Sequence, residues 1–228
     1  EANRFASFPK FSIVPGGMTN QVAKNIGLKS ASLATVKTAL SQTRDSVSVP
    51  LLQISEEDGP IYAGFLFSTG AVPQITEYTT GELHRKGIGG SLAVLGGILK
   101  GMRGDDDALM QTTPVKIDGG SLQDGAHLGT VVTSLPGLIL GLDPFWGKGD
   151  APLRLTLVDG TYRKLTRNIL GIWAGRKNKD RSGDGFHSWR RDEITYDYGG
   201  PVVLDGEFLS FPSGKFTVRP TRNVTFLR

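Results

Sequence analysis

The chain contains no cysteine among its 228 residues. This absence excludes disulfide bonds, thiolate metal sites and cysteine nucleophiles, and it fits a reducing compartment, so we expect a cytoplasmic protein. Long apolar runs are also missing. No segment reaches the roughly 18 consecutive apolar residues that a spanning helix requires. The longest candidate, Ile88 to Leu99, is broken by four glycines.

Glycine and proline are frequent, with 31 and 12 residues, which favours a strand-rich body with many turns.

Positive charge is concentrated in residues 163–191, which hold nine Lys or Arg against two Asp. Such a band suits phosphates or an anionic bilayer, and the alternative is a solvated helix followed by a basic loop. Nucleic acid is not an expected partner, because no aromatic residues are interleaved as stacking platforms.

The pattern of apolar residues predicts an α+β protein. Residues 1–46 read as the tail of an α/β domain, which the family resemblance described below identifies as the remnant of a nucleotide-binding domain, with a strand at 11–14 and helices at 20–27 and 32–40. Residues 47–212 read as a β-sandwich domain with inserted helices, and residues 213–228 as final strands that return toward the first domain. Within 47–228, strands are predicted at 47–54, 61–68, 114–117, 127–133, 153–158, 193–198, 201–204, 207–211, 215–218 and 224–227, and helices at 74–85, 91–102 and 162–173.

A glycine turn opens the first predicted helix. Gly16 and Gly17 follow the first strand, and Thr19 or Asn20 can cap the helix that comes next. Such a turn leaves backbone N–H groups free to face a phosphate. The alternative is a turn that carries glycine for its geometry alone.

A second candidate lies near the other end, in the sequence Leu204-Asp205-Gly206-Glu207. Asp-Gly between two apolar strands is a common hairpin turn, and in that interpretation Leu204 and Phe208 are core residues. In the functional interpretation Glu207 projects toward a bound nucleotide, where it positions Mg²⁺ or takes a proton from an attacking hydroxyl.

Taken together, the Pro-x-Gly turn with Asn20 and the late Leu-Asp-Gly-Glu segment resemble the diacylglycerol kinase catalytic family of bacterial soluble lipid kinases. Three further stretches fit the same family: Tyr62 to Ala71 resembles the opening of its second domain, Gly149 to Val158 its Asp-Gly-x-Leu-Asp segment, and Phe216 to Pro220 its final strand. The resemblance extends over nearly the whole chain, and its weight comes from the order and spacing of short motifs.

The sequence also departs from this family. The Gly-Gly-Asp-Gly-Thr motif that precedes the Pro-x-Gly turn in the family is absent, so we expect a chain that lacks part of its nucleotide-binding domain and is inactive alone. Met18 and Thr19 stand where the family has Thr and Gly. Arg154 replaces the second acid of the Asp-Gly-x-Leu-Asp segment, on which the family's structural metal site depends. Asp150 alone is a poor set of Mg²⁺ ligands.

The resemblance implies an ATP- and Mg²⁺-dependent lipid kinase, with Glu207 and Asp205 as catalytic acids and with Gly16, Gly17, Thr19 and Asn20 lining the nucleotide phosphates. A diacylglycerol-like substrate fits the apolar segment 135–146 and the basic residues 176–191, which we expect to contact the inner face of a membrane. The alternative for the apolar segment is a buried strand edge. A homodimer is also compatible with the resemblance.

Two other functions stay open at this point. NAD kinases share the expected architecture, so the acceptor of the phosphoryl group could instead be a nucleotide hydroxyl, although the apolar segment 135–146 argues against it. A non-catalytic module that senses lipid or membrane is the other alternative, because Met18 and Arg154 depart from the family.

Overall fold

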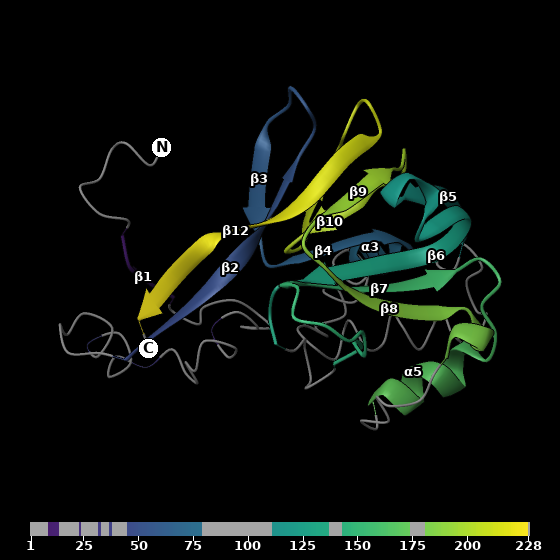
Figure 1. The fold of residues 1–228 in the computed structure, drawn as a ribbon, viewed down its shortest axis with the longest axis horizontal. Helices are drawn as coiled ribbons and strands as arrows, with labels where there is room; N and C mark the ends of the chain where they lie inside the picture. Colours follow the sequence, from purple (N-terminus) through teal and green to yellow (C-terminus); the bar gives the residue numbers. More distant parts are fainter. Residues whose placement is uncertain are drawn as a thin grey trace.

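The structure, a computed structural model, describes residues 9–13, 45–78, 111–136, 143–173 and 181–227, together with the single residues 23, 32 and 37. The expected helices at 20–27, 32–40 and 91–102 lie outside the described residues apart from these isolated positions. Twelve strands and two α-helices are described (Figure 1). The strands are β1 (Phe11–Ser12), β2 (Ser46–Ser55), β3 (Ile61–Gly64), β4 (Leu66–Gly70), β5 (Thr113–Ile117), β6 (Gln123–Thr133), β7 (Leu153–Asp159), β8 (Phe186–Arg191), β9 (Ile194–Asp197), β10 (Val202–Leu204), β11 (Glu207–Leu209) and β12 (Lys215–Leu227). The helices are α3 (Ala71–Tyr78) and α5 (Leu165–Trp173), and the 3-10 turns are η4 (Asp118–Gly120) and η6 (Ser182–Asp184).

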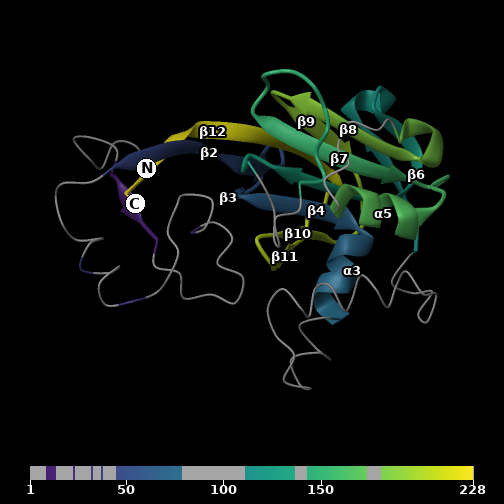
Figure 2. The same cartoon turned by 90° about the horizontal axis from the view of Figure 1, so that it is seen from below.

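The described strands form one hydrogen-bonded sheet in the order β11-β10-β4-β6-β5-β9-β12-β2-β3. Strand β7 branches from β6 and carries β8 on its other edge, and β1 pairs with the end of β12. The β1–β12 pair is parallel, and the other pairs among the described strands are antiparallel. The sheet is strongly curled, and helix α3 lies against β4, β6 and β10 below it in Figure 2. The strand-rich body with few helices is confirmed, and the division into domains stays a prediction.

Strand β7 lies at the centre of the core and is buried on both faces. Leu153, Leu155 and Leu157 are fully buried among the apolar side chains of the neighbouring strands. The alternate residues Arg154 and Thr156 point to the opposite face and are buried as well. The segment that begins at residue 143 covers this second face, as described below.

Long-range contacts change the bounds of the predicted strands in two places. The predicted strand 61–68 is two strands, β3 and β4, which are interrupted at Phe65. The predicted strands 215–218 and 224–227 are one strand, β12, with a register shift between Pro220 and Asn223. At this irregularity the hydroxyl of Thr221 accepts a hydrogen bond from the N–H of Leu51 at 2.9 Å, which stabilises the pairing with β2.

The alternative of a solvated basic loop is wrong for residues 186–191. These residues form strand β8, which pairs with β7 in an antiparallel register that sets Trp189 opposite Leu155. Phe186 is buried, and the residues from His187 to Arg191 are half-buried. Stacking of His187 on Trp189, with ring centroids 5.5 Å apart, holds this strand face in place.

Candidate active site

The Asp205–Gly206 turn joins strands β10 and β11 at one edge of the sheet. Asp205 has φ 52° and Gly206 has φ 99°, so both central residues are left-handed, as a type I′ hairpin turn requires. The register sets Leu204 opposite Glu207 across this turn. The hairpin that the sequence predicts is therefore confirmed.

The carboxylate of Asp205 binds the backbone where β3 and β4 meet. Its Oδ2 accepts a hydrogen bond from the N–H of Phe65 and its Oδ1 one from the N–H of Leu66, both at 2.9 Å. In return, the N–H of Asp205 donates to the carbonyl of Leu66 at 2.9 Å. Although Asp205 stands on an exposed turn, partial burial of its carboxylate raises its pKa, and the two N–H donors oppose that shift. These contacts fix the turn on the β3–β4 junction.

Gly64 makes this close approach possible. A Cβ atom at position 64 would lie 2.6 Å from Oδ2 of Asp205 and 2.7 Å from Cγ and Cδ1 of Leu204. Any side chain larger than hydrogen would therefore push the turn away from the strand. Gly64 and the backbone of Phe65 and Leu66 are site elements that we did not predict from the sequence, and the signal was an isolated glycine within a strand pattern.

Glu207, the first residue of β11, has different surroundings from Asp205. It is exposed, and its carboxylate makes no hydrogen bond or ion pair with another residue of the described ranges. Because Leu204 pairs with both Glu207 and Phe67, the three side chains share one sheet face, of which Phe67 and Leu204 are the buried part. Glu207 therefore stands at the rim of the core face. Phe208, on the other face, is 50% exposed, so its expected place in the core is wrong.

The predicted phosphate-binding residues Gly16, Gly17, Thr19 and Asn20 lie outside the described residues. Their expected position in one crevice with Glu207 stays a prediction.

Asp150, the predicted metal ligand, is exposed. Within the described part of the chain, no group of three or more His, Asp or Glu side chains is arranged to hold a metal ion.

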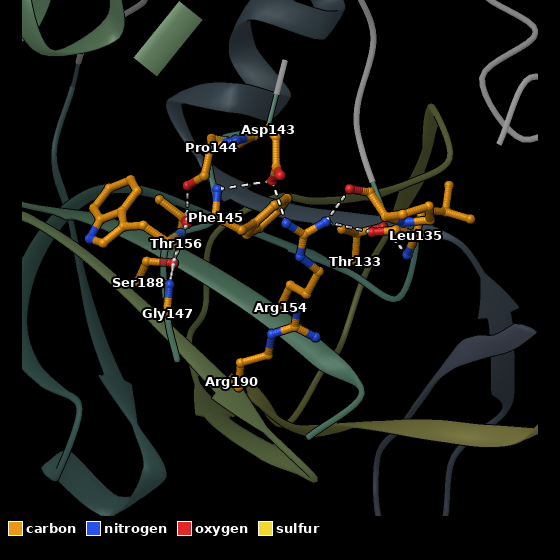
Figure 3. Close-up of polar contacts among 12 residues, drawn as sticks. Thr133, Leu135, Asp143, Pro144, Phe145, Gly147, Arg154, Thr156, Ser188 and Arg190 are labelled. Atoms are coloured by element: carbon orange, nitrogen blue, oxygen red, sulfur yellow. Dashed lines mark hydrogen bonds and ion pairs between the residues drawn. The ribbon is translucent and has the colours of Figure 1, made fainter. Parts of the chain in front are cut away.

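Arg154, four residues after Asp150, points from β7 toward Leu135 and Asp143 (Figure 3). Its Nη1 donates to the carbonyl oxygens of Leu135, at 3.0 Å, and Pro136, and its Nη2 forms an ion pair with the carboxylate of Asp143.

The ring of Phe145 completes the surroundings of this arginine, with the guanidinium carbon 4.7 Å from the ring centroid. Burial lowers the pKa of Arg154, and the charge of Arg190 lowers it further, whereas Asp143 raises it. The described residues therefore place a fixed positive charge where the family resemblance implies a metal, and they do not fit a metal ion there.

The apolar segment 135–146 is described only at its two ends. Leu135 and Phe145 are buried, which favours the interpretation as core residues for these two positions. Trp146 is half-buried, and the guanidinium of Arg181, which is itself buried, lies 5.3 Å from its ring centroid. Residues 137–142 and 174–180 lie outside the described residues, so membrane contact through 135–146 and 176–191 stays a prediction for them.

No family model matches the chain, and no curated protein matches it. Solved structures from Bacillus anthracis strain Sterne do match; two are named "putative diacylglycerol kinase" and one is named as a diacylglycerol kinase. The first has a TM-score of 0.60 and 18% identity, over 96% of this chain and 68% of that chain. The diacylglycerol kinase has a TM-score of 0.54 and 15% identity, over 98% and 68%. The third has a TM-score of 0.59 and 18% identity, over 98% and 70%.

At these identities the likeness concerns the fold. The chain therefore has the fold of these diacylglycerol kinases, as the motifs in its sequence predict. None of the described helices is long and apolar enough to cross a membrane.

Proposed function

We propose that this protein is an ATP-dependent lipid kinase of the diacylglycerol kinase type, which transfers the γ-phosphoryl group of ATP to a lipid hydroxyl. One observation supports the proposal: in a chain whose fold is similar to these structures, an exposed acid, Glu207, follows a hairpin turn that Asp205 fixes to the β3–β4 junction. The fold alone would not support a reaction, because one fold hosts many functions.

The two acids of the turn have different roles in this proposal. Glu207 is the catalytic residue, which accepts the proton of the attacking hydroxyl through its exposed carboxylate. Asp205 is a positioning residue, since both of its carboxylate oxygens are already bound to backbone N–H groups. Gly16, Gly17, Thr19 and Asn20 bind the nucleotide phosphates. When bound, ATP would supply the γ-phosphoryl group and leave as ADP, and Mg²⁺ would offset the charge of the phosphates.

The substrate is a diacylglycerol-like lipid in this proposal, and the protein meets it at the inner face of a membrane through residues 137–142 and 176–180, the parts of 135–146 and 176–191 that lie outside the described residues. Cytoplasmic location and a homodimer belong to the same proposal. Asp150 has no step in it, because its single exposed carboxylate does not form a ligand set.

The test measures transfer of labelled phosphate from ATP to diacylglycerol and, separately, to NAD, with the purified protein. We expect labelled phospholipid and no labelled NADP. Glu207→Gln should lower the rate by about 100-fold or more, as the loss of a general base does. Both Glu207 and the control position Glu57 are exposed, so neither substitution should change thermal stability.

The control Glu57→Gln removes an exposed carboxylate from the β2–β3 hairpin and should leave the rate unchanged. Labelled NADP without labelled lipid would show that the acceptor is a nucleotide. Sedimentation with liposomes without any phosphoryl transfer would instead support a non-catalytic membrane-binding module. Either result would overturn the proposal.

A further inference from the structure

The oxygen atoms around Arg154 are of the kind that a divalent metal ion prefers. Two peptide carbonyls, from Leu135 and Pro136, and one carboxylate, from Asp143, converge on its guanidinium. Carbonyl and carboxylate oxygens are the usual protein ligands of Ca²⁺ and Mg²⁺. In this chain a guanidinium already lies among them, and it stays charged at any physiological pH.

The positive charge at this place is not isolated. Arg190 lies opposite Arg154 in the β7–β8 register, and its charge adds to that of Arg154. A divalent cation that entered the same oxygen atoms would meet two arginines at close range, and that repulsion would make binding unfavourable. Arg154 therefore supplies the positive charge that these oxygen atoms bind, and together with Arg190 it makes the binding of a metal ion unfavourable.

The contacts also bring together the two ends of the segment that connects β6 to β7. Leu135 and Pro136 follow strand β6, and Asp143 begins the segment that leads to β7. Phe145, two residues after Asp143, stacks on the guanidinium as well. Further along, the N–H groups of Trp146 and Gly147 donate to the hydroxyl of Ser188 on β8, so this segment is held against the sheet (Figure 3).

We propose that Arg154 is a built-in cation that takes the place of a structural metal ion between residues 135–136 and 143–145. The connection between β6 and β7 is then held at both ends without metal. The inference depends on the contacts of Arg154 and does not require the proposed kinase activity, so either can fail without the other.

The experiment measures the thermal unfolding midpoint of the protein in millimolar EDTA and in millimolar MgCl₂ or CaCl₂. We expect the same midpoint for the wild-type protein in all three solutions. Arg154→Ala should lower the midpoint by about 10 °C, because Asp143 and two carbonyls lose their contacts with the guanidinium. That loss should not depend on metal. Arg190→Ala is the matched control, because Arg190 is half-buried and, among the described residues, its guanidinium donates only to the carbonyl of Ala151 at 3.3 Å; its midpoint should change little.

Arg154→Asp decides whether a metal can replace the arginine. It places a second carboxylate beside Asp143, so its midpoint should be low in EDTA and should rise when Mg²⁺ or Ca²⁺ is added. Asp143→Asn is a milder second variant, whose midpoint should fall without any response to metal. A wild-type midpoint that falls in EDTA would overturn the proposal. So would a folded R154D protein that responds to neither cation, or a D143N protein as stable as the wild type.

Discussion

Gly64→Ala tests whether close packing against β3 holds the Asp205–Gly206 turn, and with it Glu207, in place. The new Cβ atom would lie 2.6 Å from Oδ2 of Asp205 and 2.7 Å from two carbon atoms of Leu204, whereas ordinary contacts are 3.4–4 Å. The turn must therefore retreat by about 1 Å, and overpacking of this kind costs about 1–3 kcal/mol. If the carboxylate leaves the N–H groups of Phe65 and Leu66, each lost hydrogen bond adds about 1 kcal/mol. We expect a total loss of about 3 kcal/mol in the free energy of unfolding.

The assay is thermal and urea unfolding of the same protein, with Gly199→Ala as the control. A loss of this size corresponds to a fall of about 6–12 °C in the midpoint for a chain of about 200 residues. Gly199 has no heavy atom within 4 Å of the built Cβ position, so its alanine variant should stay within about 0.5 kcal/mol of the wild type. Amide exchange at Phe65 and Leu66 should accelerate in Gly64→Ala alone.

A double-mutant cycle separates the packing from a general loss of stability. Asp205→Ala removes the carboxylate that accepts from both N–H groups. The Cβ atom of alanine at position 64 then no longer clashes with Oδ2 of Asp205. The two substitutions together should cost at least about 1 kcal/mol less than the sum of the single losses. Equal stability of the Gly64→Ala and Gly199→Ala proteins, or strict additivity in the cycle, would refute the reasoning.

Two further predictions concern buried polar groups. His127 is fully buried and donates from Nδ1 to the carbonyl of Thr113 at 2.7 Å; burial lowers its pKa from 6.5, and this bond opposes the shift. As the pH falls, His127 is therefore protonated in the unfolded chain before it is protonated in the folded chain, so the free energy of unfolding should fall below about pH 6.5. An equally steep fall of the free energy of unfolding with pH in His127→Gln would contradict this. Ser188→Ala removes the acceptor of the Trp146 and Gly147 N–H groups, both at 3.1 Å. It should cost about 2 kcal/mol in urea unfolding, and a loss below about 0.5 kcal/mol would disprove the role of this hydroxyl.

The strands that alternate apolar residues, or that are apolar throughout, could be predicted from the sequence. Strand β7 is an example, because Leu153, Leu155 and Leu157 recur at every second position and the residues between them are also buried. Strand β8 was missed because its arginines and histidine resemble a solvated loop. They are half-buried in fact, since long basic side chains cover apolar surface with their stems.

The interruption at Phe65 shows what a local pattern cannot predict. Residues 61–68 are compatible with one strand, and the break depends on hydrogen bonds from Phe65 and Leu66 to a carboxylate about 140 residues away. The Asp-Gly turn itself was predictable, because only a few residue types tolerate two left-handed positions in succession. The role of the Asp205 carboxylate was not, because its partners are backbone N–H groups, which every residue except proline has.

The two acids of this hairpin, Asp205 and Glu207, differ in their surroundings and in the length of their side chains, not in the type of their acidic group. Both Asp205 and Glu207 carry a carboxylate, and only a glycine lies between them. The short side chain of Asp205 reaches back to the strand junction, where burial raises its pKa and two N–H groups occupy its oxygens. It has little capacity left to take a proton from a substrate, because any such step would first release the turn. The longer side chain of Glu207 starts on the exposed strand and has no partner among the described residues. In the proposed function, Asp205 therefore holds in place the hairpin that carries the reacting acid, Glu207.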